Sequence, residues 1–364
     1  MMNNTESNNT TTAASAPEHS PNHVETLVSD NLWAYVGITI IIVGTVGHIL
    51  SISVMSYSKS MRVQSSTVYL ISMSITGIVS LYTGLLRYVM FIGISGWEND
   101  LRDTSDGVCK AHMMITYASL QYFAWLQATV AVDRLISVLL PHQYMTRCKW
   151  KVGLLVSLIE LLLVLLLNIA VAVSVGQSEE GYCVPVNREF FFSIWGYIDL
   201  ISFSLLPAAI MIVCNSVILY LLYKSKMKTG SSNSVAKSIT VMLMSLNVLF
   251  LVTTLPVSVV FFLDWGTYGE RQYAVIELAW TIFSLLQYAG SACTFFLYCV
   301  TGSKFREELI KMFSCCVPKS APKITTKISQ HNGSLHPKNT THTDYKTLNV
   351  SMSLETTSVT SCNV

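Results

Sequence analysis

Three charged residues stand inside long apolar stretches, where a charge is costly and usually faces a partner or an interior cavity. Arg87 lies within TGLLRYVMF, and the acids we consider available to it are Asp199 in the fifth stretch and Glu277 at the top of the seventh. Polar and aromatic residues accompany them in neighbouring stretches: Thr116, Tyr117, Gln121 and Tyr288. We expect this set to bind a ligand, although an internal pair between Arg87 and an acid that fixes the helices is a close alternative.

The same stretches contain no set of residues that would catalyse a reaction. The sequence has no HExxH motif, no GxSG-type serine with a histidine partner and no paired aspartates in an apolar stretch. We therefore predict a protein that is not an enzyme and that has no metal or other cofactor. The net charge of +2 is too small to suggest nucleic acid as a partner.

The elements that carry these residues are seven apolar blocks. Hydrophobic residues make up 51% of the 364 residues and charged residues 12%, against about 25% charged in soluble proteins. Each block is long enough for a helix that crosses a bilayer, which needs roughly 20 apolar residues. The blocks cover 34–57, 66–93, 110–138, 150–175, 191–223, 237–264 and 275–300. We predict a membrane domain over 33–313 between disordered tails, 1–32 and 314–364.

Basic residues predict the orientation of this domain. They collect in the first, third and fifth loops and after the seventh block, so these segments belong in the cytoplasm and the N-terminus outside. The sequons at Asn3, Asn8 and Asn9 would then be available for glycosylation. We expect a multi-pass protein of the plasma membrane.

Two pairs of cysteines differ in their predicted compartment. Cys109 and Cys183 both fall on the outer side, where a disulfide is expected, with two free thiols as the alternative. Cys315 and Cys316 follow the amphipathic stretch 302–313 at the inner interface, where palmitoylation is expected.

The spacing between Cys109 and Arg134 is that of one complete crossing. The two residues are 134 − 109 = 25 positions apart, which a helix covers in nearly 38 Å at about 1.5 Å per residue. The segment AVDRLISVLLPHQY, which contains Asp133 and Arg134, resembles the DRY-type motif of rhodopsin-like (class A) G-protein-coupled receptors. An arginine at the foot of a span can also be a simple membrane anchor.

Further landmarks of that family follow in order along the chain. Pro207 resembles the proline of the fifth helix, Phe250 and Pro256 the core motif of the sixth, and Tyr298 the tyrosine that ends the seventh. The resemblance covers 33–313. It implies an all-α integral membrane protein, a seven-transmembrane helix bundle with a short amphipathic eighth helix.

Several positions depart from the family pattern. His48 replaces an asparagine, Gly77 the aspartate that holds sodium in typical members, and Thr254 a tryptophan; Thr294 and Phe295 replace Asn-Pro. We expect weak or absent sensitivity to sodium, an altered activation relay, and some of the lost polar contacts supplied by His48, for which simple packing is an equal alternative.

The class of ligand follows from exclusions and a further resemblance. Thr116 stands where amine receptors have an aspartate and Tyr288 where opsins have a lysine, so neither an amine nor retinal is favoured. The TGLLRY and TTLP stretches resemble invertebrate neuropeptide receptors of the FMRFamide-like group, which implies a peptide ligand.

The resemblance also implies a mechanism. An extracellular ligand would shift the chain to an active form in which the sixth helix, bent at Pro256, moves away and exposes Arg134 to a heterotrimeric G protein. The residue that restrains this arginine from the sixth helix in many relatives corresponds to Ala236, so we expect signalling without ligand. Arrestin and receptor kinases are expected partners of the tail. The alternatives are a receptor that binds ligand without signalling and, further away, a transporter.

Overall fold

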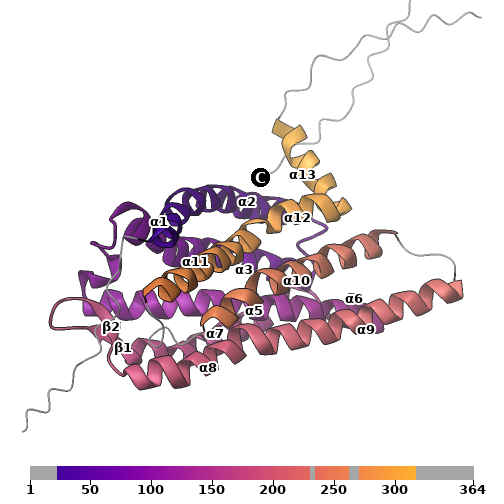
Figure 1. Ribbon diagram of the computed structural model, residues 1–364. Coiled ribbons are helices and arrows are strands. Elements are labelled where there is room, and N and C mark those ends of the chain that lie inside the picture. Colours follow the sequence, from indigo (N-terminus) through magenta and orange to yellow (C-terminus); the bar gives the residue numbers. More distant parts are fainter. Residues whose placement is uncertain (1–22, 230–233, 262–269, 317–364) are drawn as a thin grey trace, which may run out of the picture. The chain divides into compact units, whose positions relative to one another are not determined.

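Long apolar blocks become helices in a membrane because only a helix satisfies every backbone N–H and C=O group within one segment. The computed structural model describes residues 23–229, 234–261 and 270–316. Within these residues, seven long helical stretches run side by side in one bundle (Figure 1), as predicted. By compactness the chain divides into Met1–Leu309, which contains the bundle, and Ile310–Val364.

Several stretches alternate α-helix with π-helix, in which each backbone hydrogen bond reaches one residue further along the chain. The first is α1 (Val24–Asn31), η1 (Leu32–Gly37) and α2 (Ile38–Tyr57), and the second is α3 (Ser65–Ser80), η2 (Leu81–Leu85), α4 (Leu86–Tyr88) and η3 (Val89–Ile94). The fifth is η5 (Phe190–Trp195), α8 (Gly196–Asp199), η6 (Leu200–Leu205) and α9 (Leu206–Thr229).

The other stretches are simpler. The third is α5 (Asp106–Leu139), the fourth α7 (Trp150–Ser174), the sixth α10 (Ser234–Phe261), and the seventh α11 (Glu270–Ala292) with α12 (Thr294–Thr301). The short elements are η4 (Leu101–Thr104), α6 (Pro141–Arg147), β1 (Val175–Gln177), β2 (Cys183–Pro185) and α13 (Ser303–Cys316).

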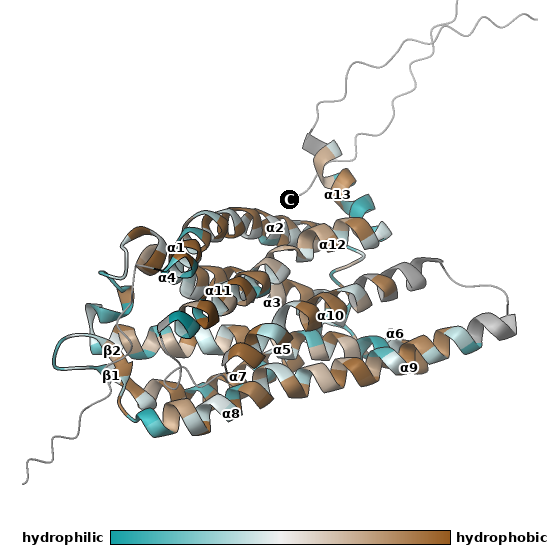
Figure 2. Ribbon diagram, in the orientation of Figure 1, coloured by the Kyte–Doolittle hydropathy of each residue, from teal (hydrophilic) through white to brown (hydrophobic). Residues whose placement is uncertain are grey.

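Four of the described helical stretches are long and apolar enough to cross a membrane by themselves. They are Val24–Tyr57, Ser65–Ile94, Trp150–Ser174 and Phe190–Lys224, and the pair Arg271–Ala292 and Thr294–Thr301 makes a fifth if it counts as one span. Figure 2 shows these stretches mainly brown, the hydrophobic end of its scale.

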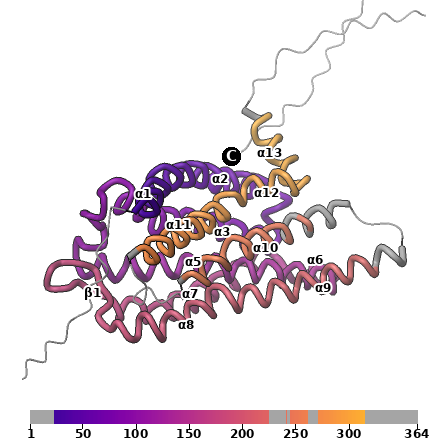
Figure 3. The backbone as a smooth tube through the Cα atoms, viewed as in Figure 1, coloured from indigo at the N-terminus to yellow at the C-terminus, as the bar shows by residue number. Residues whose placement is uncertain are grey.

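The third stretch, α5, is more polar because it is shielded from lipid. It packs against α3, α7, α9 and α10 (Figure 3), and buries Gln121, Gln127 and Asp133. A helix enclosed by protein can carry polar groups that find partners on its neighbours. In the sixth stretch, the apolar part within the described residues is Met244–Val260.

The first helix begins earlier than the sequence predicted. Val24–Asn31 lies in the segment expected to be a disordered tail, yet it is helical and packs on α11. The Ser29 and Thr281 hydroxyls hydrogen-bond at 2.7 Å, and the Trp33 indole donates to Thr281 at 3.1 Å. These polar contacts extend the bundle beyond the apolar block, which is why hydropathy did not locate the start of the helix.

The seventh stretch bends by 47° between α11 and α12 although it has no proline there. The bend follows Gly290 and Ser291, a pair that weakens a helix. The Thr294 hydroxyl donates to the Ser291 carbonyl at 2.9 Å and so satisfies a group near the break. The bend usual at Asn-Pro is therefore produced here by other residues.

Candidate functional site

A disulfide defines one end of the bundle, which we call the disulfide end. Cys109 at the start of α5 bonds to Cys183 of β2, as predicted, and closes a loop with a sequence separation of 74. Strands β1 and β2 pair antiparallel, with Gln177 opposite Cys183. Asp103 accepts a hydrogen bond from the backbone N–H of Cys183 at 2.7 Å, which ties this hairpin to the loop before α5.

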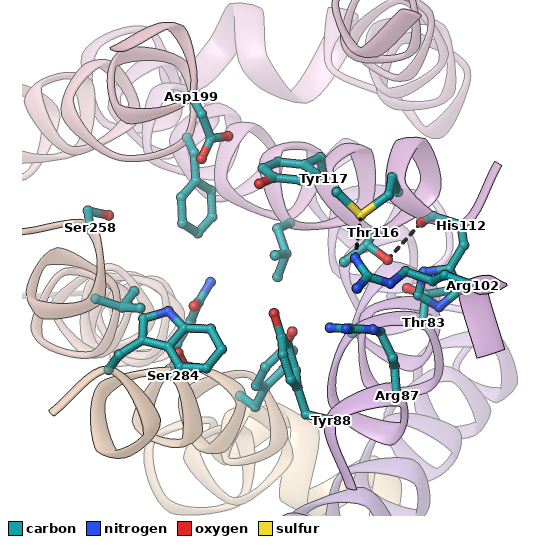
Figure 4. Close-up of a pocket in the computed structure, with 18 of the residues that line it drawn as sticks. Thr83, Arg87, Tyr88, Arg102, His112, Thr116, Tyr117, Asp199, Ser258 and Ser284 are labelled. Atoms are coloured by element: carbon teal, nitrogen blue, oxygen red, sulfur yellow. Dashed lines mark hydrogen bonds between the residues drawn. The ribbon is translucent and has the colours of Figure 1, made fainter. Parts of the chain in front are cut away.

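A cavity of about 170 Å³ opens near the disulfide end between the second, third, fifth, sixth and seventh stretches (Figure 4). Five of the seven predicted ligand-binding residues line it: Arg87, Thr116, Tyr117, Asp199 and Tyr288. Gln121 lies behind the wall and hydrogen-bonds to Asp199. Glu277 is buried but is not among the residues that line the cavity.

Arg87 pairs with Asp100, an acid outside the apolar blocks, and not with either of the acids predicted from the sequence. Its Nε donates to both carboxylate oxygens of Asp100 at 3.1 Å, and its Nη2 lies 2.5 Å from Oδ2. Asp199 and Glu277 were the expected candidates, but Asp100 belongs to the loop after the second stretch. Hydropathy excluded Asp100 because it lies outside every apolar block; its place thirteen residues after Arg87 was the signal that could have found it.

A second arginine shares this carboxylate. Arg102 donates from its backbone N–H, its Nε and its Nη2 to Asp100, the last at 2.7 Å. Burial alone would raise the pKa of the Asp100 carboxyl, but the hydrogen bonds from the two guanidinium groups outweigh this and hold the pKa well below its usual range. Asp100 is therefore ionised at neutral pH.

This lowered pKa predicts how stability depends on pH. Because the folded pKa lies below the unfolded one, near 3.9, the contribution of Asp100 is complete above pH 4 and is lost as the pH falls further. We expect the thermal stability lost in Asp100→Asn to be constant from pH 7 to about pH 4.5 and to shrink below pH 4. Thermal unfolding of the purified protein checks this, and a difference that already shrinks between pH 7 and 5 would contradict it.

Asp199 faces the cavity from the opposite side. The Gln121 amide donates to Asp199 Oδ1 at 2.7 Å, and the Asn168 amide donates to Gln121 Oε1 at 2.7 Å. A chain of neutral amides from α5 and α7 thus fixes the carboxyl. No cation approaches it among the residues that the structure describes.

Each of these two charged residues sits in a short α-helical piece between two π-helical segments. Arg87 is in α4, between η2 and η3, and Asp199 ends α8, between η5 and η6. Each π segment turns the side chains that follow it relative to a regular helix, and such segments are frequent at functional sites. Period-based reading of the sequence cannot detect them.

A second, smaller cavity of about 20 Å³ lies deeper in the bundle. Leu120, Phe203, Gln287 and Tyr288 line both cavities, and Phe250 lines only the deeper one. The rings of Phe203 and Phe250 meet edge to face with centroids 6.5 Å apart. Phe250, six residues before Pro256 in α10, is thus one side chain away from the larger cavity.

The opposite end of the bundle carries Asp133 and Arg134, and we call it the Arg134 end. Asp133 accepts hydrogen bonds from the hydroxyls of Ser65 at 2.7 Å and Tyr144 at 2.8 Å, and lies 3.3 Å from Arg134 Nη2. Arg134 is buried, and its Nε has no hydrogen-bond partner among the described residues. Tyr298, also buried, packs on Phe305 at the start of α13 with centroids 5.4 Å apart.

His48 occupies the space that a side chain at Gly77 would need. A Cβ built at Gly77 would overlap the imidazole ring of His48. The His48 Nε2 lies 3.4 Å from the Ser291 hydroxyl, while Nδ1 has no partner among the described residues. The imidazole of His48 therefore fills the space in which a carboxylate side chain at position 77 would stand.

This overlap predicts that Gly77→Ala destabilises the bundle by about 1–3 kcal/mol, the usual cost of overpacking. Adding His48→Ala should recover most of the loss because it clears the site. Gly107→Ala is the matched control, since no atom lies within 4 Å of a Cβ there. Thermal unfolding of the purified variants measures this, and equal stability of the Gly77 and Gly107 variants would refute it.

Some predicted sites fall outside what the structure describes. Asn3, Asn8 and Asn9 lie outside the described residues, and so do the side chains of Ala236, Cys315 and Cys316.

Comparison with known proteins agrees with the architecture. The family model described as "7 transmembrane receptor (rhodopsin family)" matches residues 47–298. The chain belongs to this family, whose members are receptors rather than enzymes, and it is accordingly a multi-pass membrane protein of the G-protein-coupled class.

The chain also shows a distant similarity to a named receptor. The chain is 22% identical over 277 residues to cysteinyl leukotriene receptor 1 of Sus scrofa, a match that covers 72% of this chain and 78% of the relative.

Proposed function

We propose that this chain is a plasma-membrane receptor that binds an extracellular peptide in the larger cavity and activates a heterotrimeric G protein at its Arg134 end. The observation that carries the proposal is the continuous path of side chains and helix from the larger cavity to the Arg134 end. The larger cavity shares four lining residues with the deeper one, which Phe250 lines, and α5 runs from the disulfide to Arg134.

The distribution of charge supports an extracellular disulfide end. Basic residues gather at the Arg134 end, among them Lys59, Arg62, Arg147 and Lys149, while the loops at the disulfide end mix acids with bases. Basic loops stay in the cytoplasm, and a disulfide forms in an oxidising compartment. The N-terminus, with Asn3, Asn8 and Asn9, is then extracellular and open to glycosylation.

The chemistry of the cavity supports a peptide. Its wall combines aromatic rings, such as those of Tyr117, Trp280 and Tyr288, with hydroxyl and amide groups that suit a peptide backbone. A cysteinyl leukotriene is a second candidate because the relative carries that name.

Activation would act through the residues between the two ends. A ligand that binds the active form more tightly shifts the equilibrium towards it. Contact with the wall formed by Phe203 would move Phe250, and α10 would swing about Pro256, while Pro207 in α9 lets the fifth stretch adjust. Asp133 would release Arg134, and Tyr298 would follow with the seventh stretch. Arrestin and receptor kinases would then act on the activated receptor.

The test is a signalling assay in cultured cells that express a promiscuous Gα subunit. A neuropeptide library and the cysteinyl leukotrienes are applied to cells with the natural sequence and to cells with Arg134→Ala at matched surface expression. A response that is lost in the variant supports the proposal and identifies the ligand. Equal basal signal in both cell lines, with no response to any compound, would favour a receptor that binds without signalling.

A further inference from the structure

The two charged regions of the larger cavity carry opposite charge. In the first region, the guanidinium groups of Arg87 and Arg102 pair with the carboxylate of Asp100. The net charge of these three residues is 2 − 1 = +1. The side chains of Arg87 and Arg102 are 9% and 18% exposed, whereas that of Asp100 is 3% exposed. Asp100 therefore lies behind the arginines, which face the cavity (Figure 4).

The pair that ties the loop to α4 does not involve the second arginine. The bidentate pair of Arg87 with Asp100 already ties the loop to α4. Arg102 is two residues from Asp100 on the same loop, so its pairing with Asp100 connects no separate element. Its Nη1 also donates to the Met113 sulfur of α5 at 3.1 Å, and its side chain lines the cavity. Besides this contact with α5, Arg102 adds an excess positive charge at the cavity wall.

His112 adds an unsatisfied polar group to the same region. Both ring nitrogens are buried and have no hydrogen-bond partner among the described residues, and the ring lines the cavity beside Arg102 (Figure 4). A buried polar group without a partner is costly, and a ligand oxygen would supply the partner for a ring N–H. Two guanidinium groups with an imidazole form a set suited to a carboxylate or another oxyanion.

Asp199 gives the opposite region its negative charge. Its partner is the neutral amide of Gln121, and no cation compensates it among the described residues. Figure 4 shows Asp199 across the cavity from Arg87 and Arg102. A guanidinium or ammonium group of a ligand would form a charge-assisted hydrogen bond there.

We propose that the ligand carries two opposite charges, an acidic group bound by Arg87, Arg102 and His112 and a basic group bound by Asp199. This rests on the proposed role of the larger cavity as the ligand site. If the ligand is a peptide, the proposal requires a free carboxylate and a basic side chain. A peptide with only a neutral amide facing Arg87 and Arg102 is excluded.

The experiment measures binding without signalling. Receptor purified in phosphatidylcholine nanodiscs is heated with one of three probes, and unfolding is followed by tryptophan fluorescence. The probes are N-acetyl-Arg-Leu as the free acid, its C-terminal amide, and N-acetyl-citrullinyl-Leu, in which a neutral urea replaces the guanidinium group. We expect the free acid with arginine to stabilise the receptor at a concentration about tenfold lower than either analogue, each of which lacks one of the two charges, as a charge-assisted hydrogen bond provides.

Two variants assign the charges to their residues. Arg87→Gln should remove the preference for the acid over the amide and keep the preference for arginine over citrulline, and Asp199→Asn should do the reverse. Arg102→Gln repeats the first test with the pair of Arg87 and Asp100 intact, in case Arg87→Gln does not fold. Lys110→Gln, which loses a cation paired with Asp106 at the same end outside the cavity, should behave as the natural sequence.

Equal stabilisation by the three probes, or none by any of them, overturns the proposal. The proposal is also overturned if Arg87→Gln and Arg102→Gln keep the preference for the acid over the amide, or if Asp199→Asn keeps the preference for arginine over citrulline. The charges of the ligand would then be recognised elsewhere. Failure of G-protein coupling is distinguishable: the probe preferences would hold in nanodiscs while cells expressing the receptor stay silent.

Discussion

Replacing Arg134 by alanine is expected to reduce both ligand-evoked and basal G-protein activation to the level of untransfected cells, while the receptor still reaches the surface. Arg134 is a buried cation. Its Nη2 lies 3.3 Å from the Asp133 carboxylate and 3.4 Å from the Tyr144 hydroxyl. In the proposed mechanism Arg134, near the end of α5, is the group that would meet the G protein once released. Second-messenger accumulation at matched surface expression measures the effect.

The opposite change should result from weakening the restraint on this arginine. Asp133→Asn removes the ion pair and keeps one of the two oxygens that accept from the hydroxyls of Ser65 and Tyr144, so basal signalling should rise several-fold. If Ala236 leaves Arg134 without a second restraint, the natural sequence already signals without ligand. Arg147→Gln, a change at an exposed residue of the same end, is the control for the positive charge lost in Arg134→Ala. Basal signal unchanged in Asp133→Asn would show that this pair does not hold the inactive form.

Replacing Cys109 and Cys183 together by serine is expected to remove most receptor from the cell surface. In the chain-entropy account, a closed loop with a separation of 74 residues contributes roughly 4 kcal/mol, a large part of the stability of a typical domain. The bond is also buried against Val171, Phe191 and Trp195, so its loss disturbs the packing beside the larger cavity. Surface labelling and thermal unfolding measure the loss.

A cysteine outside the disulfide provides the control for this experiment. Cys148 lies near the Arg134 end and is a free thiol, so Cys148→Ser should leave surface expression unchanged. Retention of normal surface expression and thermal stability by the double variant would mean that hydrogen bonds such as that from the Cys183 N–H to Asp103 suffice to hold the hairpin.

The sequence predicted the helices well because membrane insertion is a local requirement. A block such as 150–175 must become a helix whatever its neighbours are, and the structure has Trp150–Ser174. The disulfide was also predictable, since the predicted orientation put one pair of cysteines, Cys109 and Cys183, on the outer side. Landmarks around Arg134 and Pro256 indicated the receptor family, which the family match confirms.

The prediction of the site was less complete, for a physical reason. Whether two side chains meet depends on the rotation, depth and bending of different helices, which hydropathy does not encode. The π-helical segments rotate Arg87 and Asp199 relative to a regular helix, and the loop brings Asp100 beneath Arg87.

What the sequence determined by itself is therefore the set of spans, their order and the class of protein, because each follows from local composition and spacing. The tertiary structure alone decided that Asp100 is the partner of Arg87, that the ring of His48 lies where a side chain at Gly77 would stand, and that the seventh stretch bends without a proline. These depend on contacts between residues far apart in sequence, which form only when the helices pack.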